Sequence, residues 1–137
     1  MLGYLFDTDH PTFYQHGHPL VSHRLRLQPP ATVEISVVTV EEILRGRLAR
    51  LARGGDGATR IRHYALLEEA LVDFAQFPVV SYDQAVEDQF QRIRHIQIGT
   101  QDLKIAATAL ASQLPLVTAN RRDFAKVPGL AIEDWSV

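Results

Sequence analysis

The sequence predicts an α/β fold, with a central, mostly parallel β-sheet and α-helices on both of its faces. Short runs rich in β-branched, aromatic and aliphatic residues recur along the chain, and longer segments with apolar residues at helical spacing separate them. Strands that alternate with helices favour parallel pairing, because each helix returns the chain to the edge where the next strand starts. The chain has 137 residues, enough to bury a core without disulfides, so we expect one domain over residues 1–137.

Five short apolar runs are expected to be strands. Each is bounded by residues that favour turns or helix starts. They cover residues 4–6, 32–38, 77–80, 116–118 and 130–132. His10 and Pro11 are expected to close the first of these segments, because proline cannot continue a central strand.

The segments between these runs are expected to be helices. A polar, histidine-containing helix is predicted within residues 11–27, and the other predicted helices cover residues 39–53, 58–76, 82–95 and 101–112. Thr39 and Glu42 have the spacing of a capping box, in which each side chain binds a free backbone N–H at the helix start. The glycines at residues 54–57 then form a turn, so we expect a helical hairpin at about residues 40–76.

The composition excludes several classes of protein. The net charge is −2, so the chain lacks the overall basic charge of many nucleic-acid-binding proteins, and a polyanion would need a local basic patch or a metal ion. Cysteine is absent, which excludes a disulfide framework and a cysteine-based zinc site and agrees with a reducing, cytoplasmic setting. The chain shows no signal-peptide pattern and no apolar stretch of membrane length, so we expect no membrane partner.

Four acidic residues follow or begin the predicted elements at one edge of the sheet. Asp7 comes directly after the first strand, Glu42 lies in the helix after the second, Asp102 begins a later helix, and Asp123 follows the strand at residues 116–118. Ligands in such folds bind beyond the carboxyl ends of the strands. Converging carboxylates repel one another unless a cation lies among them, and hard oxygen ligands favour Mg²⁺ or Mn²⁺. The pattern therefore favours metal-assisted phosphodiester hydrolysis.

Most of these acids also have a purely structural interpretation. Glu42 completes the proposed capping box, Asp102 would interact favourably with a helix dipole, and Asp123 would cap a short helical turn. Asp9, before His10 and Pro11, is a typical turn residue. Asp7 is the exception, because an acid at the end of an apolar strand has no local structural role.

Four stretches of the sequence resemble the PIN-domain ribonucleases, and most closely the VapC toxins of bacterial toxin–antitoxin pairs. They are YLFDTDH, ISVVTVEEILRG, IGTQDLKIAATALA and LPLVTANRRDFAKVPGLAIEDW. They follow the family's order and spacing and together span almost the whole chain. The family pattern of Thr, Glu and Gly falls on Thr39, Glu42 and Gly46, so it selects Glu42 over its neighbour Glu41.

The resemblance implies a PIN-like fold and roles for particular residues. Asp7 and Asp102 would be the principal metal ligands, and Glu42 and Asp123 would complete the site, one of them acting as a general base. Many PIN domains have an acid where this chain has Asn120, so the fourth ligand is either Asn120 or Asp123. We expect Asp123, with Asn120 as a polar helper. Further residues expected to hydrogen-bond the ligands or phosphate are Thr8 and Thr118.

The resemblance also implies partners. It predicts an Mg²⁺-dependent endoribonuclease (Mn²⁺ as a substitute) that acts on RNA, forms a homodimer and is inhibited by a VapB-type antitoxin. Arg121 and Arg122 are the preferred RNA-binding residues, because their loop also carries the proposed ligands. The hairpin at about residues 40–76 is the expected docking place of the antitoxin.

Three other interpretations fit parts of this pattern. The main alternative is a catalytically weak or inactive PIN-fold module that only binds RNA or protein. A haloacid-dehalogenase-type phosphatase would also have the Asp7–Asp9 spacing, but Pro11 stands where that family has a small Thr or Val. A DNA or flap nuclease would use the same metal chemistry. The histidines at residues 16, 18 and 23 lack the further ligands of a zinc site.

Overall fold

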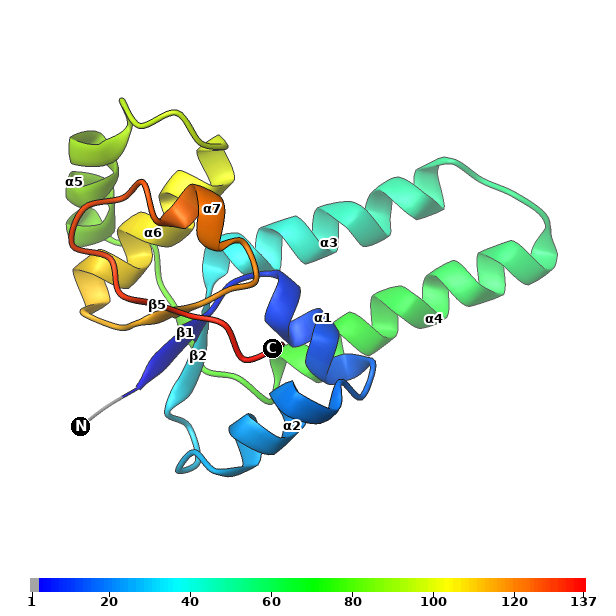
Figure 1. Cartoon of the computed structure of the whole chain (residues 1–137). Helices are drawn as coiled ribbons and strands as arrows, with labels where there is room; N and C mark the ends of the chain where they lie inside the picture. Colours follow the sequence, from blue (N-terminus) through cyan, green and yellow to red (C-terminus); the bar gives the residue numbers. More distant parts are fainter. Residues whose placement is uncertain (1–2) are drawn as a thin grey trace.

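The computed structural model describes residues 3–137, which form a parallel sheet covered by helices (Figure 1). The strands are β1 (Tyr4–Phe6), β2 (Val33–Ser36), β3 (Val79–Val80), β4 (Leu116–Val117) and β5 (Ile132–Glu133). Their order in the sheet is β3-β2-β1-β4-β5, and every adjacent pair is parallel. The predicted α/β class with a parallel sheet is therefore confirmed, with β1 at the centre.

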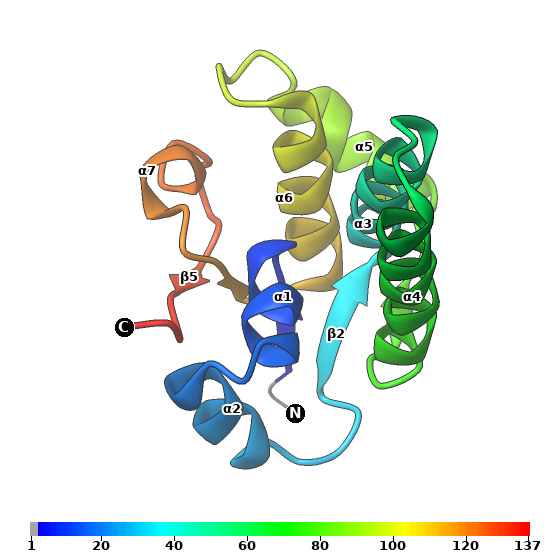
Figure 2. The same ribbon diagram turned by 90° about the vertical axis from the view of Figure 1, so that its right-hand side faces the viewer.

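The helices connect these strands and cover both faces of the sheet. They are α1 (Asp9–Gln15), α2 (Pro19–Arg26), α3 (Val37–Ala52), α4 (Gly57–Phe74), α5 (Gln84–Ile93), α6 (Thr100–Ser112) and α7 (Arg121–Phe124). Figure 2 shows α5 and α6 behind and above the sheet, with α1 and α2 in front. None of the helices in residues 3–137 is both long enough and apolar enough to cross a bilayer.

Alternating strand residues supply two separate cores. Leu5 belongs to the cluster that packs against α5 and α6, whereas its neighbour Phe6 belongs to the cluster with Trp135 and the residues of α2. Leu116 and Val117 divide between the two clusters in the same way. Successive side chains of a strand point to opposite faces, so this division is expected of a sheet buried on both sides.

The helices α3 and α4 project together from the sheet as an antiparallel pair (Figure 1). Large apolar side chains remain exposed along them: Leu48, Ile61, Tyr64, Leu71 and Val72. Each of these five side chains is more than half exposed, so none of them belongs to a core. Apolar residues at helical spacing form helices here, but these side chains are not buried. The pair of α3 and α4 therefore exposes apolar side chains to its surroundings.

Several predicted boundaries were wrong. The helix expected within residues 11–27 is two helices, because Gly17 adopts a positive φ of 74° and Pro19 starts a new helix. Pro11 lies inside the first turn of α1, where its missing N–H leaves no intrahelical bond unmade, so it does not exclude a helix. The last strand begins two residues later than expected, at Ile132.

The start of α3 also differs from the prediction. The second strand ends at Ser36 rather than residue 38, and Ser36 is the N-cap of α3. Its hydroxyl accepts a hydrogen bond of 3.0 Å from the backbone N–H of Thr39. The predicted capping box of Thr39 and Glu42 was therefore wrong, because both residues lie within the helix. Glu42 is free to interact elsewhere.

Candidate functional site

The predicted site residues come from segments that follow adjacent strands. Asp7 follows β1 and Thr118 follows β4, its neighbour in the sheet. Glu42 lies in α3, which follows β2, the strand on the other side of β1. Parallel strands end at the same edge of a sheet, so the chain returns acidic and hydroxyl side chains to this edge.

Asp7 is the most deeply placed of these acids, with only 6% of its surface exposed. Its Oδ1 accepts a hydrogen bond of 2.8 Å from the backbone N–H of Thr8, and its Oδ2 accepts one of 2.7 Å from the hydroxyl of Thr118. Burial, reinforced by the negative charge of Asp9, raises the pKa of Asp7 from 3.8 to about 7, although both hydrogen bonds lower it. This carboxylate is held in place, but no cationic side chain of residues 3–137 neutralises it.

Thr8 connects Glu42 to Asp7, because it hydrogen-bonds both carboxylates. The hydroxyl of Thr8 donates a hydrogen bond of 2.6 Å to Oε1 of Glu42 and lies 3.2 Å from the hydroxyl of Thr39. The side chain of the neighbouring Glu41 contacts a different segment: its Oε1 accepts a hydrogen bond of 2.8 Å from the amide of Gln101. Glu42, and not Glu41, therefore contacts the segment that carries Asp7.

Asp102 lies in the first turn of α6 and is half-buried. Its pKa is raised, first by burial and then by the negative charges of three other acids: Glu42, Asp123 and Asp9. Asp102 also contributes to the raised pKa of Asp7. Asp102 therefore lies within electrostatic reach of the three other predicted acids: Asp7, Glu42 and Asp123.

Asp123 and Asn120 interact with each other at the short helix α7. Asn120 is the N-cap of α7, and its side-chain oxygen accepts a hydrogen bond of 3.4 Å from the backbone N–H of Asp123. The Asn120 amide also donates a hydrogen bond of 3.2 Å to Oδ2 of Asp123. Nζ of Lys126 lies 3.9 Å from Oδ1 of the same carboxylate. Asn120, not Asp123, therefore caps this turn, and it orients the Asp123 carboxylate.

The acids share a region without forming a tight cluster. Within residues 3–137, no three acidic or histidine side chains are close enough together to hold a metal ion as they stand. In the same part of the chain, Asp7, Glu42 and Asp102 form no ion pair with a basic side chain. Burial, and then repulsion by neighbouring acids, raises the pKa values of Asp7 and Asp102. A hard divalent cation would fit among these carboxylates as their missing counter-charge.

Asp9, which the sequence interpretation treated as a turn residue, and His10, which was expected to close the first strand, contribute contacts at this edge of the sheet. Oδ2 of Asp9 accepts a hydrogen bond of 3.0 Å from the backbone N–H of Ala119, in the loop between β4 and α7. Oδ1 of Asp9 lies 2.6 Å from Nδ1 of His10, which is completely buried. The adjacent Asp9 and His10 are visible in the sequence, but the burial of His10 was not predictable from its polar surroundings.

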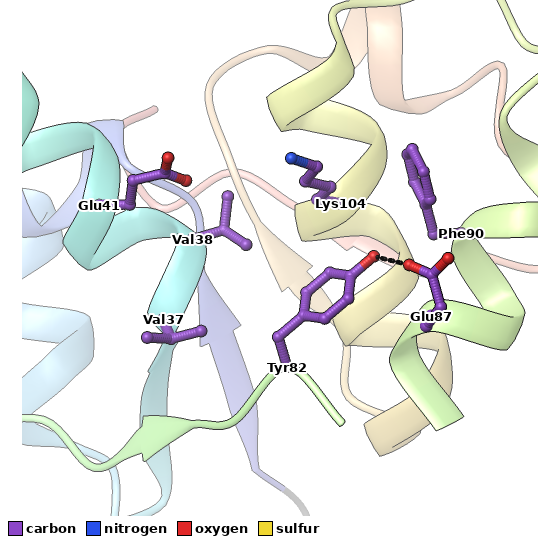
Figure 3. Close-up of a pocket in the computed structure, with 7 residues that line it drawn as sticks. All are labelled: Val37, Val38, Glu41, Tyr82, Glu87, Phe90 and Lys104. Carbon is purple, nitrogen blue, oxygen red and sulfur yellow. Dashed lines mark hydrogen bonds between the residues drawn. The ribbon is translucent and has the colours of Figure 1, made fainter. Parts of the chain in front are cut away.

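A pocket of about 380 Å³ lies beside the acidic edge, between α3, α5 and α6 (Figure 3). Tyr82 closes one side, and its hydroxyl donates a hydrogen bond of 2.7 Å to Glu87. The other lining residues are Val37, Val38, Glu41, Phe90 and Lys104. None of the predicted ligands lines this pocket, so the acidic edge and the pocket are separate features of the same end of the molecule.

Comparison with known proteins identifies the family. The chain matches the PIN domain over residues 12–130. It is 31% identical over 103 residues to Ribonuclease VapC1 of Rickettsia felis, covering 72% of each chain, and 25% identical over 134 residues to Ribonuclease VapC2 of the same organism, covering 96% of this chain and 97% of that protein. The crystal structure of DNA-bound VapBC from Salmonella typhimurium superposes with a TM-score of 0.78, at 27% identity, over 98% of this chain and 99% of that one.

The chain therefore belongs to the PIN-domain family. Within that family its similarity is to the VapC ribonucleases, so the resemblance found from the four sequence motifs is confirmed. Asp7 precedes the matched region, and its assignment to the site depends on its contacts with Thr118 and Thr8.

Proposed function

We propose that this chain is a metal-dependent endoribonuclease toxin of a type II toxin–antitoxin pair, which hydrolyses RNA phosphodiester bonds with an Mg²⁺ site made of four carboxylates. The observation that carries the proposal is that Asp102 lies within electrostatic reach of Asp7, Glu42 and Asp123. Among residues 3–137, Asp7, Glu42 and Asp102 have no basic partner. The likeness to VapC ribonucleases supports RNA as the substrate.

The proposed division of roles follows from the contacts. Asp7 and Asp102 would hold the ion, and Glu42 and Asp123 would complete the site. A bound Mg²⁺ or Mn²⁺ would offset the repulsion among these carboxylates, activate a water and stabilise charge on the phosphate. Thr118 fixes the Asp7 carboxylate and Thr8 fixes the Glu42 carboxylate, so both hydroxyls keep the ligands in position before the ion arrives.

The proposed RNA-binding residues are Arg121 and Arg122, which are exposed on α7 directly beside Asp123. A polyanion approaching an acidic site needs local positive charge, and the net charge of −2 does not supply it. Lys126 is exposed in the same segment and lies near Asp123. This basic rim would hold the phosphate backbone on one side of the carboxylates.

We also propose a VapB-type antitoxin as the partner, with the projecting pair of α3 and α4 as its docking surface. A groove along α3 is lined by four apolar residues, Leu44, Leu48, Ala49 and Ala52, and by the charged pair Glu41 and Arg45. Together with the exposed apolar side chains of α3 and α4, it suits an amphipathic helix. Leu48→Glu is expected to weaken capture of the antitoxin encoded beside this chain without changing RNA cleavage. The predicted homodimer stays a prediction, which light scattering of the purified chain would test.

The direct test of the proposed reaction is RNA cleavage by the purified chain. We expect discrete RNA fragments with Mg²⁺ or Mn²⁺, no fragments with EDTA, and loss of cleavage in Asp102→Asn. The matched control is Asp88→Asn, which changes an exposed acid on α5 that contacts Gln84. Equal cleavage by Asp102→Asn and the native chain would contradict the proposal. Metal or RNA binding without cleavage would favour the binding-module alternative.

A further inference from the structure

The side chain of His10 is completely buried at the start of α1, next to the acidic edge. Its ring packs against Phe6 and Phe13, with centroids 5.4 Å from each. A buried imidazole needs hydrogen-bond partners for both ring nitrogens, because an unpaired polar atom in this environment is costly. The partners of the two nitrogens therefore indicate which groups His10 holds in place.

The two partners determine which ring nitrogen carries the proton. The backbone N–H of Trp135 points at Nε2 over 3.3 Å, and since an N–H is always a donor, Nε2 accepts. The carboxylate of Asp134 lies 3.7 Å from Nε2, beyond hydrogen-bond distance. Nδ1 therefore carries the proton and donates a hydrogen bond of 2.6 Å to Oδ1 of Asp9.

The other oxygen of Asp9 extends this chain of contacts to the loop between β4 and α7. Oδ2 of Asp9 accepts the Ala119 N–H. The residues on either side are also held, because the hydroxyl of Thr118 donates to Asp7 and accepts the backbone N–H of Asn120 over 3.0 Å. Three successive loop residues are thus fixed, just before the helix that carries Asp123.

We infer that His10 is a positioning residue for the carboxylate site. Its Nδ1–H orients Asp9, and Asp9 holds the Ala119 N–H so that the loop leading to Asp123 keeps its place beside Asp7. The inference rests on the proposed function for its catalytic consequence, but the positioning itself is a property of the metal-free chain. Groups that orient metal-binding residues typically change metal affinity 10- to 100-fold when they are removed.

A pair of variants separates the two sides of the imidazole. In His10→Asn the amide nitrogen takes the place of Nδ1 and still donates to Asp9, but the contact with Trp135 is lost. In His10→Gln the amide oxygen reaches the place of Nε2 and still accepts from Trp135, but the bond to Asp9 is lost. Both variants remove the ring from the same aromatic environment, so a purely structural role would affect them alike.

The first measurement needs neither metal nor activity. Hydrogen exchange of the Ala119 amide, followed by NMR in the presence of EDTA, is expected to accelerate about 10-fold or more in His10→Gln, because Asp9 loses the donor that orients it. In His10→Asn the exchange is expected to stay near the native rate. In the native protein, the ¹⁵N shifts of the His10 ring are expected to show a protonated Nδ1 and an unprotonated Nε2.

The second measurement is Mn²⁺ affinity by calorimetry, with RNA cleavage alongside. We expect His10→Gln to bind Mn²⁺ about 10-fold more weakly, and we expect His10→Asn to bind it almost as well as the native chain.

If either variant does not fold, Asp9→Ala tests the contact between Asp9 and Ala119 with a change at a partly exposed side chain. The same acceleration of Ala119 exchange is expected. Equal changes in Ala119 exchange for the two His10 variants, or none in Asp9→Ala, would overturn the inference. Failure of the native chain to cleave RNA would count against the proposed function alone, because Ala119 exchange does not depend on cleavage.

Discussion

The hydroxyl of Thr118 donates a hydrogen bond of 2.7 Å to Oδ2 of Asp7, joining the ends of two adjacent strands across 111 positions of the chain. Thr118 is completely buried, and Asp7 is nearly so. The same hydroxyl accepts the backbone N–H of Asn120. One side chain therefore connects the central strand to the loop that leads to Asp123, and its removal should disturb both.

Thr118→Val keeps the shape of the side chain and removes the hydroxyl. We expect a loss of about 1 to 3 kcal/mol in the free energy of unfolding, because the Asn120 N–H and the Asp7 carboxylate both lose a buried partner. We also expect Mn²⁺ affinity to fall about 10-fold. Urea unfolding and calorimetry would measure the two effects. Thr118→Ser retains the hydroxyl and should stay close to the native protein; if it behaves like Thr118→Val, the hydrogen bond is not the cause.

The raised pKa of Asp7 predicts how the stability of the metal-free protein depends on pH. Asp7 keeps its proton up to about pH 7 in the folded state and loses it near 3.8 when unfolded. Between these values the folded state binds more protons, so this contribution is fully present below pH 4 and is lost as the pH rises towards 7. The change is on the order of 4 kcal/mol.

Asp7→Asn should remove this contribution, since the amide stays neutral at every pH. Urea unfolding in EDTA between pH 4 and pH 8 would measure the difference in unfolding free energy between the variant and the native chain. We expect the variant to gain on the native protein as the pH rises. A difference that does not change with pH would show that Asp7 is already ionised in the folded protein.

Thr8 and Glu42 are expected to have coupled effects on Mn²⁺ affinity. Thr8→Val and Glu42→Gln should each reduce Mn²⁺ affinity, and the double variant should lose less than the sum of the two, with a coupling of about 1 kcal/mol. The reason is that Thr8 acts by orienting the Glu42 carboxylate over 2.6 Å. Calorimetry on the four proteins of this cycle provides the measurement, and strictly additive losses would mean that the two residues act independently.

Arg121 and Arg122 are expected to bind RNA phosphates and not particular bases. Arg121→Ala and Arg122→Ala should each weaken RNA binding and reduce the slope of log affinity against log salt by about 1. Fluorescence anisotropy with a catalytically silent Asp102→Asn background would measure binding without cleavage. Arg62→Ala, an exposed change on α4, is the control. The RNA-binding assignment fails if all three substitutions have the same effect.

The parts of the fold that follow from local patterns were predictable from the sequence. Strands alternate with helices, and burial on both faces makes the central strands continuously apolar, so their number and parallel pairing could be inferred. Helix starts were harder to predict. Ser36 ends a strand and caps the next helix at once, and the competing Thr39–Glu42 pattern led to the wrong cap.

The composition of the site was predictable in part, and its geometry was not. Topology alone puts Asp7, Glu42 and Asp123 at one edge of the sheet, because each lies in a segment that follows a strand. Asp102 starts α6, which follows another helix, so its place depended on the family resemblance. The contacts of Asp9 with Ala119 and of His10 with Trp135 join residues more than 100 positions apart. No local pattern encodes such pairs, so Asp9 was interpreted as a turn residue and His10 only as part of a strand end.

The central claim is that four carboxylates act as one metal site, and Mn²⁺ binding tests it most directly. Calorimetric titration would compare the native chain with Asp7→Asn, Glu42→Gln, Asp102→Asn and Asp123→Asn, with Asp88→Asn as the control. The account predicts that Mn²⁺ binds the native chain and the control equally and binds each of the four variants at least about 10-fold more weakly. Native affinity in all four variants, or no Mn²⁺ binding by the native chain, would contradict it.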